Sequence, residues 1–155
     1  MNLQEIITLA IAIYGAVLAT LTMVMAIRRD RRSLAVRMKT AMFTYDDRLG
    51  PRMLEIEVAN TGHRELVVDA PQLKISGDER RSIVLMDAHG LRDFPKRLAQ
   101  GERAAVRIEF RDVAMTLQRE GHAKARIYAV CKDSAGHAHR SKPWAVDVQE
   151  WLKGD

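Results

Sequence analysis

The sequence predicts a mainly β protein: an antiparallel Ig-like β-sandwich of about seven or eight strands with one short helix, preceded by a single N-terminal transmembrane helix. Three observations predict this fold. Near the N-terminus, the 22 residues from 6 to 27 include no charged side chain. After residue 33, short segments alternate apolar and polar residues. Turn-forming residues separate these segments about every ten residues, as in β-sandwiches. We therefore assign residues 1–32 to the membrane helix with a basic juxtamembrane segment, and residues 33–155 to the Ig-like domain.

The uncharged run is long enough to cross a membrane. As an α-helix it extends about 33 Å, against a hydrocarbon core of about 30 Å. Its polar side chains are three threonines and Tyr14, too few for the polar face of a soluble helix. The apolar run is followed by a basic cluster, Arg28, Arg29, Arg31 and Arg32.

This basic cluster sets the expected orientation. Lys and Arg flanking a membrane helix are retained on the cytoplasmic side. The N-terminus is therefore predicted outside, and the β-domain on the cytoplasmic face of a bacterial inner membrane. The four arginines are also expected to contact anionic lipid.

A cleaved secretory signal is the competing interpretation of the apolar run. Such a signal carries positive charge before its apolar stretch. Residues 1–5 contain no Lys or Arg, and the basic cluster comes after the run. The order of charges therefore favours an uncleaved anchor.

Small residues recur on one side of the predicted helix. This spacing lets two helices approach closely, so it is compatible with a homo-oligomer or with packing in a larger membrane complex. The residues concerned are Ala12, Gly15, Ala16 and Ala19.

The first strand is expected at residues 34–45, close to the membrane, with a turn at residues 46–51 where Asp, Gly and Pro cluster. The next segment alternates cleanly and stops at residues 60–62. It directs Leu54, Ile56 and Val58 toward a core, and Glu55 and Glu57 toward solvent.

Further strands are expected at residues 66–70, 73–76 and 82–88, and a strong alternation follows at Val106, Ile108 and Phe110. Residues 112–120 predict two helical turns, with Asp112 as N-cap and Gly121 at the C-terminal stop.

The last two strands are predicted on either side of a turn at residues 133–136. Ala125, Ile127, Ala129 and Cys131 share one face of the first, and Trp144, Val146 and Val148 share one face of the second. Pro143 indicates that the final strand lies at a sheet edge or a bulge.

Three runs carry a resemblance to a known class of proteins. They are Ile-Glu-Val-Ala-Asn-Thr-Gly at residues 56–62, Leu-Ala-Gln-Gly-Glu at residues 98–102, and the hairpin from Lys-Asp-Ser-Ala-Gly at residues 132–136 to Arg-Ser-Lys at residues 140–142. Together they resemble small bacterial proteins with one N-terminal transmembrane helix and an Ig-like domain. The resemblance implies the fold and the topology, and it brings no catalytic residues.

Composition excludes several classes of function. From residue 33 onward 21 basic and 18 acidic residues give a net charge of +3, too weak and too dispersed for nucleic-acid binding. A single cysteine, Cys131, excludes an intrachain disulfide and a cysteine-rich zinc site, and is expected to be a buried hydrophobe. The nine glycines are too far apart for a phosphate-binding loop. We therefore predict no enzyme, no catalytic residues and no cofactor.

His137 and His139 are the strongest metal candidates, because residues two apart on a strand point the same way. A polar hairpin arm is the alternative, and it is favoured because no third ligand is evident nearby. Asp133, Ser134 and His137 have the residue types of a nucleophilic triad, but one tight turn does not give them its geometry. No metal site is predicted, and metal binding by the histidine pair is left open.

The sequence thus predicts a membrane-tethered, non-enzymatic protein-interaction module. Its partner is expected at the edge strand near Trp144, with Trp151 beyond it in the tail. A second basic group, Arg80, Arg81, Arg92, Lys96 and Arg97, is expected to be a solvated face. The alternatives are an accessory subunit assembled through its transmembrane helix and, less favoured, a metal-dependent enzyme.

Overall fold

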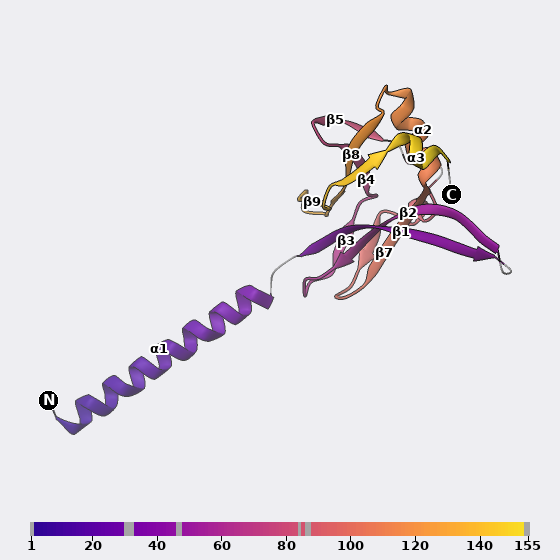
Figure 1. The fold of residues 1–155 in the computed structure, drawn as a ribbon. Helices are drawn as coiled ribbons and strands as arrows, with labels where there is room; N and C mark the ends of the chain where they lie inside the picture. The colour runs from indigo at the N-terminus through magenta and orange to yellow at the C-terminus, as the bar shows by residue number, and fades with distance from the viewer. Residues whose placement is uncertain (1, 30–32, 46–47, 84, 86–87, 154–155) are drawn as a thin grey trace.

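The computed structural model describes residues 2–29, 33–45, 48–83, 85 and 88–153 (Figure 1). The N-terminal helix, α1 (Leu3–Arg29), extends away from a mainly β domain. Its stretch Leu3–Ile27 has a mean hydropathy of 2.2, and none of it is buried by the rest of the chain. By length and composition this helix is able to span a membrane, a property that a signal sequence shares.

The three threonine hydroxyls of α1 donate hydrogen bonds to backbone carbonyls of the same helix. The hydroxyl of Thr8 donates to the carbonyl of Gln4 at 2.8 Å, and the hydroxyl of Thr20 donates to that of Ala16 at 2.8 Å. Thr22 donates to the carbonyl of Leu18 in the same way, at 3.0 Å. Because lipid offers no hydrogen-bond partners, such internal bonds suit a helix surrounded by hydrocarbon.

The first antiparallel sheet has the order β1-β2-β7. Its strands are β1 (Leu34–Tyr45), β2 (Arg48–Asn60) and β7 (Arg103–Glu109). The predicted first strand is confirmed. Of the turn expected at residues 46–51, residues 46–47 lie outside the described residues, and residues 48–51 already belong to β2. Pro51 is tolerated inside β2 since β7 pairs only from Met53 onward, which leaves the proline beside a single neighbouring strand.

The second antiparallel sheet has the order β10-β8-β4-β5, with β9 also paired to β8. Its strands are β4 (Gln72–Ile75), β5 (Asp78–Ile83), β8 (Lys124–Lys132), β9 (Ala138–Arg140) and β10 (Trp144–Asp147). A separate pair, β3 (Leu66–Val68) with β6 (Lys96–Leu98), completes the β structure. Over the described residues this gives ten strands where seven or eight were expected, and three of them are only three residues long.

The buried faces of the two larger sheets meet in one hydrophobic core. The alternation predicted for β2 is confirmed, since Leu54, Ile56 and Val58 are fully buried. The inner face predicted for β8 is confirmed as well, with Ile127, Ala129 and Cys131 fully buried.

Three short helices were predicted incompletely or not at all. They are the 3-10 helix η1 (Leu91–Asp93), α2 (Phe110–Arg119) and α3 (Val148–Lys153). Phe110 starts α2 instead of ending a strand, and the N-cap is Glu109, so the prediction of Asp112 as N-cap was wrong. Gly121 does stand just beyond the end of α2, with a φ of 83° that favours glycine.

Helix α3 replaces the tail that was expected after the last strand. Val148 begins this helix instead of continuing β10, and it is buried. The ring of Trp151 stacks on that of Phe110, with 4.2 Å between centroids and 8° between planes. This contact joins α3 to α2, so tertiary packing decides both helices.

Candidate interaction surface

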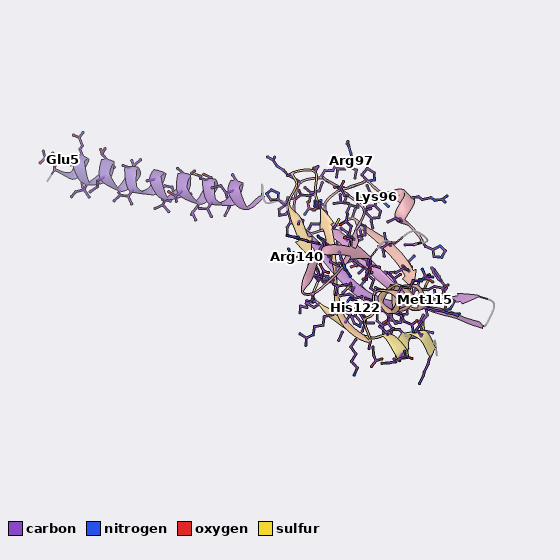
Figure 2. The ribbon with its side chains drawn as sticks, turned by 90° about the horizontal axis from the view of Figure 1, so that it is seen from above. Glu5, Lys96, Arg97, Met115, His122 and Arg140 are labelled. Carbon is purple, nitrogen blue, oxygen red and sulfur yellow. The ribbon has the colours of Figure 1, made fainter. Side chains whose placement is uncertain are left out.

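A groove of about 660 Å³ lies between β1 and the segment that connects β9 to β10. One wall is formed by residues 34–39 of β1. The other wall is formed by Arg140, Lys142, Pro143 and Trp144. Figure 2 shows Arg140 on the side of the β-domain that faces α1, and Figure 1 shows β9 on that side too.

Four cationic side chains line this groove. Arg37 and Lys39 come from β1, and Arg140 and Lys142 come from the opposite wall. Arg140 also lies over the ring of Tyr128, with 5.5 Å from its guanidinium carbon to the ring centroid. The groove therefore gathers cationic side chains from two segments of a domain that is nearly neutral as a whole, although Lys39 is also ion-paired with Glu57 on the outer face of the sheet.

The backbone of β1 is unpaired along this groove. Strand β1 ends the order β1-β2-β7, so within the part of the chain that the structure describes only β2 pairs with it. Asn60 faces Leu34, but its N–H donates away from β1, to the carbonyl of Glu102 at 3.0 Å. Leu34 and Asn60 are thus a non-hydrogen-bonded pair. Because such pairs recur at every second residue of an antiparallel ladder, the N–H and C=O groups of Val36 and Met38 also point away from β2, toward the groove.

Trp144 is the one predicted partner contact that the structure leaves accessible. It is half-buried, packs against the core and lines the groove. Trp151, the other predicted partner contact, is only 8% exposed, so it offers a partner little surface. The packing of its ring on Phe110 accounts for this burial.

The outer face of the first sheet carries an ion-pair network beside the groove. Lys39 contacts both carboxylates of β2, Glu57 by a direct hydrogen bond and Glu55 at 3.9 Å. From β7, Arg107 Nε donates to Glu55 Oε2 at 2.6 Å, and Arg103 lies 3.8 Å from Glu57. The strands bring these charges together by placing residues from opposite positions of the ladder on one face.

Glu57 corrects the prediction that both carboxylates of β2 face bulk solvent. The residue is 7% exposed because cationic side chains cover it. The hydrogen bond from Lys39 is the largest influence on its carboxyl group, and with the nearby positive charges it outweighs burial and lowers the pKa. A cross-strand partner, which the alternation of β2 does not reveal, thus keeps Glu57 ionised.

The turn before β9 is organised around one buried carboxylate, Asp133. Its Oδ1 accepts hydrogen bonds from the backbone N–H groups of Ala135 and His137, each at 2.9 Å. Its Oδ2 lies 3.2 Å from His139 Nε2 and 3.6 Å from His137 Nδ1. Burial acts to raise the pKa of this carboxyl, but the bonds from His139 and the two amides together hold it below its usual value.

These contacts give the two histidines a structural role in the turn. Among the described residues, no group of three or more His, Cys, Asp or Glu side chains has the arrangement of a metal site. Ser134 does not contribute to the Asp133 contacts just described, and its side chain is exposed. The contacts of Asp133 hold the turn before β9, and Ser134 is not part of them.

Replacing Asp133 with alanine is expected to lower the free energy of unfolding by about 1.5–3 kcal/mol at pH 7, because two backbone amides of the turn lose a charged, buried acceptor. Since folding lowers the pKa of Asp133, its stabilisation is complete above the unfolded value of about 3.9 and is lost as the pH falls through the folded value. The difference between the two proteins should therefore shrink below about pH 4.

Urea unfolding of the full-length protein in nonionic detergent, followed by tryptophan fluorescence, measures this difference because both tryptophans lie in the β-domain. The matched control is Asp93→Ala, which removes an exposed carboxylate and should change stability by less than about 0.5 kcal/mol. Equal losses in the two variants, or a difference that grows in acid, contradict the role given to Asp133.

Cys131 is buried as predicted, with 0% of its surface exposed. Its Sγ donates to the carbonyl of Asp69 at 3.1 Å. Burial, followed by the charges of Asp69 and Asp133, raises the pKa of this thiol to about 12. The group is therefore protonated and unreactive in the folded protein.

The remaining predicted residues lie apart from the groove. Arg28 and Arg29 end α1, with side chains that are not described, whereas Arg31 and Arg32 lie outside the described residues. The small residues of α1 are exposed along its surface: Ala12, Gly15, Ala16 and Ala19.

The second basic group is spread over β5, η1 and β6. Arg81 pairs with Asp78 at 3.2 Å, and Arg97 pairs with Glu65 at 3.1 Å. Figure 2 shows Lys96 and Arg97 well away from Arg140. These cations are therefore not part of the groove.

Sequence reasoning missed the groove cations. A signal for them is present, because Arg37 and Lys39 are spaced by two on β1, as are Arg140 and Lys142 in the later hairpin. Nothing in the sequence joins two segments that lie about a hundred residues apart. No protein-family model matches the chain, and a comparison with curated proteins finds no match either.

Proposed function

We propose that this chain is a membrane-tethered, non-enzymatic interaction module, anchored by α1 and contacting another protein through the edge of its β-domain beside Trp144. The proposal places the β-domain on the cytoplasmic face of a bacterial inner membrane. It rests on the order of charges around α1, where the arginines follow the apolar run.

The exposed apolar surface of α1 is the observation that carries the proposal. The helix is joined to a domain with its own hydrophobic core, and it contributes nothing to that core. In water, an apolar surface of this length has no stable environment. A tether also raises the effective concentration of a partner in the same membrane, so a small domain needs only weak contacts.

We further propose that the β-domain is an Ig-like sandwich. The order β1-β2-β7 agrees with strands A, B and E of that fold, and the order β5-β4-β8 with β9 or β10 agrees with strands C′, C, F and G. The same topology supports the resemblance to small bacterial proteins with one transmembrane helix.

A photo-crosslinking amino acid tests the proposed contact in cells that make the full-length protein. Placed at residue 144, beside the groove, it is expected to give one dominant cross-linked protein in the membrane fraction. The matched control places it at Gln118, an exposed residue of α2, and should give little product.

Deleting residues 3–29 tests the contribution of the tether. We expect at least a tenfold lower cross-linking yield from residue 144 after this deletion, because the effective concentration falls. Equal yields from residues 144 and 118, or no product from either, contradict the interaction module. Loss of the partner on replacing Gly15 with leucine, with the β-domain intact, would instead indicate a subunit assembled through α1.

A further inference from the structure

We propose that the groove beside β1 binds an extended acidic segment of a partner protein, which adds to the first sheet as an antiparallel or parallel strand next to β1. This inference rests on the proposed function and names the partner chemistry of the same surface. Its three supports are an unpaired backbone edge, a concentration of positive charge and a location near the membrane anchor.

The backbone edge supplies the first support. The outward N–H and C=O groups of Val36 and Met38 repeat every second residue, which is the pattern that a further strand requires. The wall formed by residues 34–39 is about 20 Å long at about 3.4 Å per residue. A partner strand of five or six residues would cover it.

The opposite edge of the same sheet is obstructed at Ala105 and Arg107 of β7. His89 N donates to the carbonyl of Arg107 at 2.8 Å, and Arg107 N donates to the carbonyl of His89 at 2.9 Å. Gly90 permits this close approach, since a Cβ there would lie 2.6 Å from the carbonyl oxygen of Ala105. Strand addition to this sheet is therefore directed to β1.

Charge selects the class of partner strand. An added strand would place alternate side chains beside Arg37 and Lys39 on the outer face, with Arg140 and Lys142 on the facing wall. Like charges on adjacent strands are destabilising, so the cations oppose pairing of β1 with a second copy of itself. Acidic side chains at alternate positions of the added strand would instead be attracted to these cations.

The other face of the added strand meets apolar surface. Val36 and Met38 project from β1 toward the core side, and Trp144 with Pro143 lines the far wall. The expected partner sequence therefore alternates acidic and apolar residues over five or six positions. Trp144 would pack on the apolar side chains of the partner strand.

The position of β1 in the chain places this groove near the anchor. Five residue steps separate Arg29, the end of α1, from Leu34, the start of β1. A fully extended chain covers at most about 18 Å in that length. With α1 in a membrane, the groove lies close to the bilayer surface, so the acidic segment is expected next to a membrane-spanning part of the partner.

Synthetic peptides test this inference on the full-length protein in neutral nanodiscs. The probe is a fluorescent peptide of about eight residues that alternates glutamate and valine, long enough to cover residues 34–39 at about 3.4 Å per residue. We expect saturable binding by fluorescence anisotropy. The double variant Arg37→Glu with Lys142→Glu should weaken it at least tenfold, and should instead bind a peptide that alternates lysine and valine.

The matched control reverses two cations outside the groove, Arg80→Glu with Arg81→Glu, and should leave the affinity unchanged. Lack of reaction at the buried Cys131 thiol verifies that each variant is folded. A second probe, N-methylated at alternate backbone nitrogens, should lose binding if the peptide adds as a strand.

Three results overturn the inference. They are undiminished binding of the glutamate peptide to the groove variant, equal binding of the N-methylated probe, or absence of saturable binding to the native chain. These outcomes would leave the proposed function standing, because that function is tested separately, by cross-linking from residue 144 to a partner protein in the absence of the peptide.

Discussion

Trp151→Ala is expected to lower the free energy of unfolding by about 3–5 kcal/mol, a large part of the about 5–15 kcal/mol that stabilises a typical domain. The side chain is buried and stacks on Phe110, so it contributes to the contact between α3 and α2. Truncation leaves a cavity between these helices and loses the aromatic contact.

The reactivity of the single thiol measures this loss. Cys131 is buried and has a raised pKa, about 12, so it reacts only when the β-domain opens. Full-length protein in nonionic detergent is titrated with urea, and thiol labelling marks the unfolding midpoint. The midpoint of the Trp151→Ala variant should shift markedly to lower urea.

Trp144→Ala is the matched control for this experiment. Trp144 is half-buried and lines the groove, so its truncation should cost about 1 kcal/mol or less. A larger stability loss at Trp144 than at Trp151 would contradict the division between an interaction residue and a core residue.

Two charges in the middle of α1 are expected to release the protein from membranes. In the variant Leu18→Lys with Leu21→Lys, each lysine costs about 2.5–3.5 kcal/mol at the centre of a spanning helix. The measurement is the fraction of the full-length chain that stays in the membrane pellet after alkaline carbonate extraction. We expect the native chain in the pellet and the variant mainly in the supernatant.

A lysine at the end of the helix is the control for this effect. Leu3 is the first residue of α1 and is 74% exposed, so a lysine there reaches water and Leu3→Lys should stay in the pellet. Equal retention of all three proteins would show that α1 is not what holds the chain in the membrane.

The inward positions of β2 and β8 were predictable from sequence, whereas the burial of Met53, Tyr128 and Val130 on the other faces of these strands was not. In β2 and β8 the inward positions are fully buried, Leu54 and Ile56 in one strand and Ile127 and Ala129 in the other. A period of two follows directly from the alternation of side chains on a pleated strand. Local sequence therefore contains the information that these elements need.

The starts of α2, which follows β7, and of α3, which follows β10, were not predictable in the same way. Phe110 continues the alternation of β7, and Val148 continues that of β10, yet both residues start helices. The stack between Phe110 and Trp151, which are far apart in sequence, joins the two helices. The start of α3 also has a local signal that sequence reasoning missed, because Asp147 Oδ1 accepts hydrogen bonds from the N–H groups of Gln149 at 3.1 Å and Glu150 at 3.4 Å.

The groove was hidden for a related reason. Its cations come from β1 and from the hairpin before β10, which belong to different sheets, and only the packing of the two sheets against each other brings these segments together. Glu57 shows the same limit, because its burial depends on Lys39 from the neighbouring strand. Sequence alternation assigns a residue to a face, but the residues that cover that face come from the topology.

The mass of the chain purified from the membrane fraction tests the central claim most directly, since the claim is that α1 remains attached as the anchor of the β-domain. We predict an intact chain of 17.5 kDa that includes residues 3–29. A shorter mature chain that lacks the apolar helix would identify a removed signal sequence, and it would contradict the account of a tethered module.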